Sequence, residues 1–157
     1  MKKIVILILG VCVLLLASDF VSNQVGRIID VISGKPQIVK TEPEPKATEI
    51  AQDAKIKIKF NKDIDQKTLN NRSISISYLN ADLKFFINPF LGSHFDYDKE
   101  TKTLIITPPN KFLPNQQIEV RLSNLIKSVD GKELARSGQK TDSEETRYVL
   151  RFKTKAD

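Results

Sequence analysis

Strict alternation of polar and apolar residues is the feature that most limits how this chain can fold. The segment Lys55–Phe60 reads Lys-Ile-Lys-Ile-Lys-Phe, so every second side chain is apolar. This period is that of a β-strand with one face on a core and the other in water. The same period recurs, with small faults, in Ser73–Tyr78, Lys102–Thr107, Gln117–Leu122 and Tyr148–Phe152. Because half-buried strands need a partner layer, the chain is predicted to be all-β.

Turn signals and weaker strands complete the predicted architecture. Shorter apolar runs predict strands at Leu83–Ile87 and His94–Tyr97, and a first edge strand is expected within Lys35–Thr41. Asp98–Thr101 is typical of a hairpin turn, and Asp130-Gly131 is a strong turn sequence. About seven short strands, with no convincing helix between them, favour two packed sheets. We therefore predict an immunoglobulin-like antiparallel β-sandwich.

The N-terminal segment has the layout of an export signal. Lys2 and Lys3 precede an unbroken apolar run from Ile4 to Ala17. The run is short for a membrane-spanning helix, which needs about 20 residues, and Ala17 offers a cleavage site. A retained membrane anchor is the alternative, because apolar residues recur at helical spacing from Phe20 to Ile32. Either interpretation places the rest of the chain outside the cytoplasm, since the two lysines stay on the cytoplasmic side.

The chain therefore divides into three predicted regions. Residues 1–18 are expected to form a hydrophobic helix that acts as a signal peptide or a membrane anchor. Residues 19–44 are predicted to be an amphipathic helix and a linker, because prolines at 36 and 43 interrupt any helix. Residues 45–157 are the predicted sandwich domain, with a first edge strand that starts near residue 37.

Composition excludes several classes of function. The formal net charge is +6, but the lysines are scattered and aromatic residues do not alternate with them, so no nucleic acid partner is expected. The single cysteine, Cys12, excludes an intramolecular disulfide and a cysteine-based metal site. Val11 is too large to precede a lipidated cysteine. The basic surface is interpreted as a solvated face that keeps the protein soluble.

No group of residues in the sequence indicates a reaction. His94 is the only histidine, and its alternating neighbours predict a half-exposed strand position rather than a catalytic triad. Two carboxylate pairs, Asp63 with Asp65 and Asp96 with Asp98, have the oxygen chemistry that calcium prefers, although neither lies in a glycine-containing calcium loop. We expect no enzyme, no cofactor and no transition-metal site, and a weak calcium site stays open.

Several short motifs occur in a fixed order after Pro45. They are Ile56–Asp65 with Thr68-Leu69, then Thr103–Pro108 with Leu113-Pro114-Asn115 and Ile118–Leu122, then Ile126–Leu134 and a closing Phe152-Lys153-Thr154. In this order and spacing, the region from about Ile38 to Thr154 resembles the bacterial Ig-like domain of the SbsA S-layer type. The resemblance implies an Ig-like fold and a cell-envelope setting. It implies no reaction, because a fold of this kind hosts many roles.

One apolar stretch is the best candidate for contact with a partner. Leu83–Leu91 contains three phenylalanines, so its side chains either belong to the core or form an exposed apolar patch. For the second case, Phe85, Phe86, Phe90 and Leu91 are the candidate partner-binding residues.

The sequence leaves two candidate functions open. The first is an exported cell-envelope module with a structural, adhesive or spacing role and no catalysis. The second is a periplasmic or extracellular ligand-binding or inhibitor protein that uses the Phe85–Leu91 region as its contact surface. The expected partners are the membrane, if the N-terminal segment is not cleaved, and an envelope protein or polysaccharide.

Overall fold

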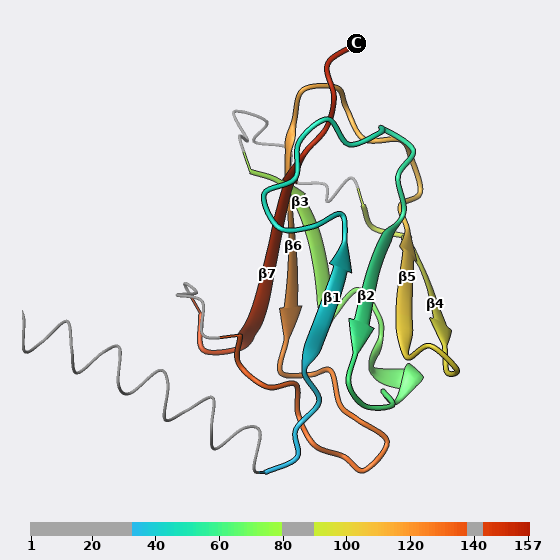
Figure 1. The fold of residues 1–157 in the computed structure, drawn as a ribbon, viewed down its shortest axis with the longest axis vertical. Helices are drawn as coiled ribbons and strands as arrows, with labels where there is room; N and C mark the ends of the chain where they lie inside the picture. The colour runs from blue at the N-terminus through green and yellow to red at the C-terminus, as the bar shows by residue number, and fades with distance from the viewer. Residues whose placement is uncertain (1–32, 80–89, 138–142) are drawn as a thin grey trace, which may run out of the picture.

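The computed structural model describes residues 33–79, 90–137 and 143–157, which contain seven strands and one 3₁₀ turn (Figure 1). The turn is η1 (Gln66–Thr68). The strands are β1 (Ile38–Glu42), β2 (Ile56–Phe60), β3 (Ile74–Tyr78), β4 (His94–Asp98), β5 (Thr103–Thr107), β6 (Gln117–Ser123) and β7 (Thr146–Lys153).

The strands form two antiparallel sheets. One sheet has the order β1-β2-β5-β4 and the other the order β3-β6-β7. Labelled A to G along the chain, these are the A-B-E-D and C-F-G sheets of a constant-type immunoglobulin sandwich. The predicted all-β fold is therefore confirmed for the described residues.

The core lies between the two sheets and follows the predicted alternation. In β2, Ile56, Ile58 and Phe60 are buried, while the two lysines between them are exposed. The facing sheet contributes the buried residues Ile118, Val120 and Leu122 of β6. The buried side chains of both strands belong to one hydrophobic core, which keeps them out of water.

The five strongly alternating segments all form strands, and so do the predicted edge strand β1 and the weaker strand β4. β1 pairs with β2 from Ile38 onward, so the sandwich includes part of the segment expected to be a linker. The predicted strand at Leu83–Ile87 and the two predicted N-terminal helices lie outside the described residues. Among the residues that are described, no helix is long and apolar enough to cross a membrane.

Both predicted turns are present. The Asp98 side chain accepts hydrogen bonds from the backbone of Glu100 and Thr101 and from the Thr101 hydroxyl, which closes the β4–β5 hairpin. Gly131 has a φ of +80°, and its backbone N–H donates to the carbonyl of Ser128. A positive φ at this position favours glycine, which explains the Asp-Gly sequence.

The chain enters and leaves the sandwich at opposite ends (Figure 1). At the entry end lie residues 33–37, the loops 61–73 and 99–102, and the segments 124–137 and 143–145. The loops 43–55 and 108–116 lie at the other end, together with Leu79, residues 90–93 and the C-terminus. The described part of the molecule is thus elongated, with its first and last residues separated along the strand direction.

Candidate functional site

Of the four predicted partner-binding residues, the structure describes Phe90 and Leu91, and Phe90 belongs to the core. Phe90 is only 3% exposed. Its ring centroid lies 5.1 Å from that of Tyr78 and 5.5 Å from that of Phe112, and Phe112 in turn contacts Phe152 at 5.7 Å. Phe90 is therefore withdrawn as a contact residue, because its ring is used in this aromatic stack. Phe85 and Phe86 lie outside the described residues.

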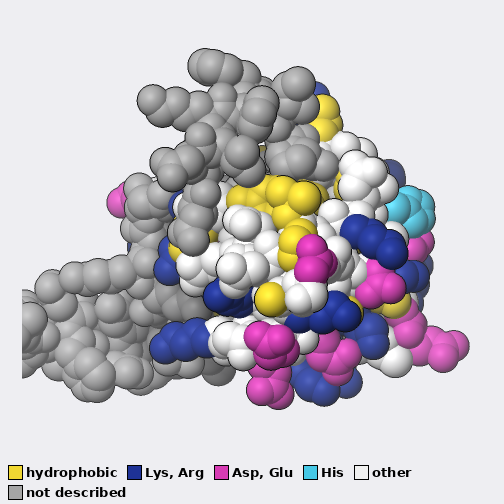
Figure 2. Space-filling model, turned by 90° about the horizontal axis from the view of Figure 1, so that it is seen from above, with side chains coloured by type: hydrophobic (Ala, Val, Ile, Leu, Met, Phe, Trp, Pro, Cys, Tyr) yellow, Lys and Arg dark blue, Asp and Glu magenta, His cyan; other side chains and the backbone are white. Residues whose placement is uncertain are grey.

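Three leucines next to this stack do reach solvent. Leu91 is 66% exposed, Leu113 47% and Leu79 40%. Each directly follows a ring of the stack, because Leu79 follows Tyr78, Leu91 follows Phe90 and Leu113 follows Phe112. The Leu113 N–H donates to the Tyr78 hydroxyl at 3.1 Å. Figure 2 looks onto this end of the sandwich and shows apolar side chains gathered among polar ones. Leu91 thus remains a candidate contact residue, and Leu79 and Leu113 join it.

A second surface is a shallow, open concavity of about 360 Å³ on the outer face of the four-stranded sheet. Its lining is Lys40, Thr41, Glu42, Lys57, Lys59, Asp98, Thr101, Thr103 and Ile105. Glu42 accepts from Lys40 at 2.9 Å and from Lys57 at 3.1 Å, and these hydrogen bonds, that of Lys40 foremost, lower the pKa of Glu42. Glu42 thus offsets the positive charges of Lys40 and Lys57, so the concavity carries both positive and negative groups.

The outer face of the other sheet holds a buried carboxylate. Glu119 points away from the core, yet its side chain is only 2% exposed. Arg121 donates from Nε to one carboxylate oxygen at 2.5 Å, and Arg151 donates from Nε to the other at 2.6 Å. Burial raises the pKa of Glu119, but the hydrogen bonds from the two arginines outweigh it and leave the pKa below its usual value.

Sequence reasoning missed this group of charges. Alternation in Gln117–Leu122 places Glu119 and Arg121 on one face, but their partner Arg151 comes from a different strand. That contact follows from the register in which Glu119 lies opposite Arg151. A sequence alone does not give this register.

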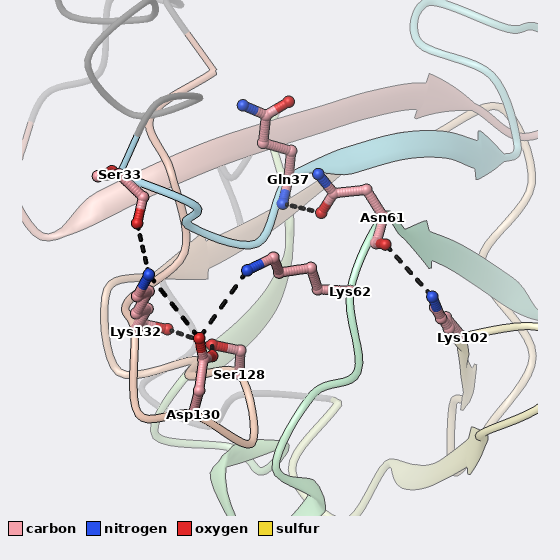
Figure 3. Close-up of polar contacts among 8 residues, drawn as sticks. All are labelled: Ser33, Gln37, Asn61, Lys62, Lys102, Ser128, Asp130 and Lys132. Atoms are coloured by element: carbon pink, nitrogen blue, oxygen red, sulfur yellow. Dashed lines mark hydrogen bonds and ion pairs between the residues drawn. The ribbon is translucent and has the colours of Figure 1, made fainter.

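A third polar cluster fixes the point where the chain enters the sandwich (Figure 3). Lys132 donates to the carbonyl of Ser33 at 2.6 Å, and Asp130 lies within 4 Å of both the Lys132 and Lys62 ammonium groups. The N–H of Gln37 donates to the Asn61 side chain at 2.7 Å. Residues 33–37 are therefore bound to two loops of the domain.

The predicted ionisable residues have structural partners. His94 is exposed on β4 and pairs with Asp96 at 2.9 Å. Asp65 caps η1 by accepting from the N–H of Lys67, and Asp63 accepts from the Tyr97 hydroxyl at 3.5 Å. Within residues 33–79, 90–137 and 143–157, no three His, Cys, Asp or Glu side chains gather as metal ligands would.

These features define an antiparallel Ig-like β-sandwich. The chain belongs to the bacterial Ig-like domain family, whose sequence pattern matches residues 33–154. The resemblance inferred from the sequence motifs is thereby confirmed. No curated protein sequence matches the chain significantly.

Solved S-layer structures show the same fold at low sequence identity. The S-layer protein rSbsC(31-844) superposes with a TM-score of 0.50 and 16% identity, over 77% of this chain and 14% of that one. The N-terminal part of the bacterial S-layer protein SbsC gives 0.50 and 17%, over 77% and 24%. An L,D-transpeptidase from Mycobacterium smegmatis gives 0.46 and 12%, over 76% and 40%. This chain thus spans less than a quarter of either S-layer chain.

Proposed function

We propose that the protein is an exported cell-envelope module with a structural, adhesive or spacing role and no catalytic activity. The observation that carries the proposal is the opposite placement of the two ends of the domain (Figure 1). A module entered at one end and left at the other separates whatever is attached to its ends by the length of the sandwich. Membership of the bacterial Ig-like domain family supports the envelope setting.

The fixed entry supports a spacing role. Besides the Lys132 and Asn61 contacts, the N–H of Ala135 donates to the carbonyl of Pro36 at 2.9 Å. These hydrogen bonds tie residues 33–37 to the body of the domain rather than leaving them as a free linker. An N-terminal anchor would then set the direction of the long axis, so that the end with Leu79, Leu91 and Leu113 points away from the membrane.

Cell fractionation tests the proposed location. We expect the protein in the membrane or extracellular fraction, and intact-mass measurement of that material shows whether the chain is cleaved after Ala17. Arginines in place of Leu9 and Leu14 are expected to keep the protein in the cytosol, because each charge in the apolar run costs about 2.5–3.5 kcal/mol. Val39→Arg with Val129→Arg is the matched control, since both valines are exposed. Recovery of the unaltered protein as soluble cytosolic material would refute the proposal.

A second candidate function is ligand binding or inhibition through the end of the sandwich that carries Leu79, Leu91 and Leu113, which we call the apolar end. The exposure of Leu91 and Leu113 beside the aromatic stack favours it, whereas the burial of Phe90 removes one of the residues first considered.

Photo-crosslinking in intact cells tests this candidate. A photoreactive phenylalanine analogue at position 91 is expected to give a discrete cross-linked product. The same analogue at position 129, which is 70% exposed and lies in the segment that follows β6 at the entry end, is expected to give none. Identical cross-linking patterns at the two positions would count against a contact surface at the apolar end.

A further inference from the structure

The outer face of the four-stranded sheet has a cationic side and an anionic side. On β2, Lys57 and Lys59 point outward, because they alternate with buried residues of the core. On β4, Asp96 and Asp98 are exposed on the same outer face, while the residues between and before them pack toward the core. Because β5 lies between β2 and β4, opposite charges are held on its two sides (Figure 1).

β5 forms a neutral strip between the charged strands. Its outward residues Thr103, Ile105 and Thr107 are half-buried and carry no charge. Two of them, Thr103 and Ile105, belong to the lining of the shallow concavity on this face. The middle of the face is thus hollow and contains an apolar side chain, whereas its two sides are charged.

The strand register sets the charges in matching rows. Lys57 and Asp96 both lie opposite Ile105, one on each side of it. The next outward row repeats this arrangement, with a lysine of β2 and an aspartate of β4 on the two sides of Thr103. A half-turn about a line parallel to β5 therefore exchanges the positions of the lysines with those of the aspartates.

This pattern is complementary to itself under one kind of two-fold axis. When two copies pack these faces together, an axis parallel to β5 places β2 of one copy over β4 of the other, so lysines face aspartates. An axis perpendicular to the strands would place β2 over β2 and β4 over β4, which brings like charges together. Two-fold contacts between identical faces are the commonest in homo-oligomers, and aligned sheets pack about 10 Å apart.

Charges on both sides remain accessible to a second copy. Lys57 donates to Glu42 at 3.1 Å, and Glu42 is shared with a second lysine. Lys59 has no ion pair among the residues that the structure describes. On the other side, Asp96 pairs with His94, yet 56% of the Asp96 side chain is exposed.

We propose that this face binds a second copy of the chain, with the two-fold axis parallel to the strands and along β5. The lysines of β2 in each copy face the aspartates of β4 in the other, and the two Ile105 side chains meet at the centre. Both entry ends then point the same way, as two copies anchored in one membrane require. The contact is weak, because exposed ion pairs contribute little, and anchoring strengthens it by raising the local concentration. Only this last gain rests on the proposed envelope location.

Cross-linking through a single cysteine tests the symmetry of the contact. In the purified full-length chain with Cys12→Ala, kept in nonionic detergent, Thr103→Cys with a short bismaleimide is expected to give a product of twice the chain mass. The reason is that residue 103 lies on the axis and faces its own counterpart. Ser75→Cys, exposed on the outer face of the other sheet, is the matched control and should give about tenfold less product. Equal yields from the two positions, or no product from Thr103→Cys, would overturn the proposal.

Charge reversal tests which residues make the contact. Lys57→Glu and Asp96→Lys, each added separately to the Thr103→Cys chain, should lower the yield about fivefold, because each brings like charges together twice in the symmetric pair. Both changes in one chain should restore the yield to within about twofold, since the two positions then carry opposite charges again. All three variants should keep the melting temperature of the unaltered protein, because both side chains are exposed. A combined variant that yields no more product than the single ones would overturn the proposal. None of these results depends on where fractionation finds the protein.

Discussion

Ile58→Asp is expected to unfold the sandwich domain. Ile58 is fully buried in the middle of β2, opposite Leu104 of β5 and Thr41 of β1. No cation lies on this inward face of β2, because its neighbours there are Ile56 and Phe60. Burying an unpaired carboxylate costs several kcal/mol, about 5 in this setting, which is comparable to the whole stability of a typical domain.

Thermal or urea unfolding followed by circular dichroism measures this effect. Lys59→Asp is the matched control, because it places the same carboxylate one residue away on the exposed face of β2. A surface change of this kind is expected to alter the free energy of unfolding by about 0.5 kcal/mol. A cooperative transition of Ile58→Asp close to that of the unaltered protein would contradict the orientation of β2.

The strand pattern could be predicted from the sequence because a half-buried strand repeats every two residues. In β2 and β3 each isoleucine is separated from the next by a lysine or a serine, and the structure buries the isoleucines. The two turns were equally local, since Asp98 and Gly131 act within a few residues of their own positions. Features decided by short stretches of chain were therefore accessible without a structure.

The candidate sites were harder to predict because they depend on distant parts of the chain. Phe90 is buried because Tyr78 and Phe112, from two other segments, surround its ring. The local sequence gives only an apolar run, which fits a core or a surface patch equally well. Glu119 similarly looks like an exposed strand residue until the pairing of β6 with β7 brings Arg151 to it. Long-range contacts of this kind decide what a surface offers to a partner.

Glu119→Gln is expected to destabilise the domain by about 2 kcal/mol at pH 7, although glutamine has nearly the same size. Glu119 is almost completely buried and accepts from two arginines, whereas a glutamine side chain has one oxygen acceptor and one NH₂ donor. One guanidinium N–H would then face another donor, and the two positive charges would lose the negative charge between them. Hydrogen bonds to charged groups contribute about 1.5–3 kcal/mol each, which sets the scale.

The same substitution should remove part of the acid sensitivity of the domain. The pKa of Glu119 in the folded protein is lowered from its ordinary value of 4.5, so its charge stabilises the fold above that pH. This stabilisation is lost as the pH falls through the lowered pKa, and glutamine has no such titration. The free energies of unfolding of Glu119→Gln and the unaltered protein, measured by urea unfolding, should therefore differ less at pH 3 than at pH 7. The exposed Glu42→Gln is the control, with little effect at either pH because solvent screens its ion pairs. Equal free energies of unfolding for Glu119→Gln and the unaltered protein at pH 7 would contradict the prediction that the charge of Glu119 stabilises the fold.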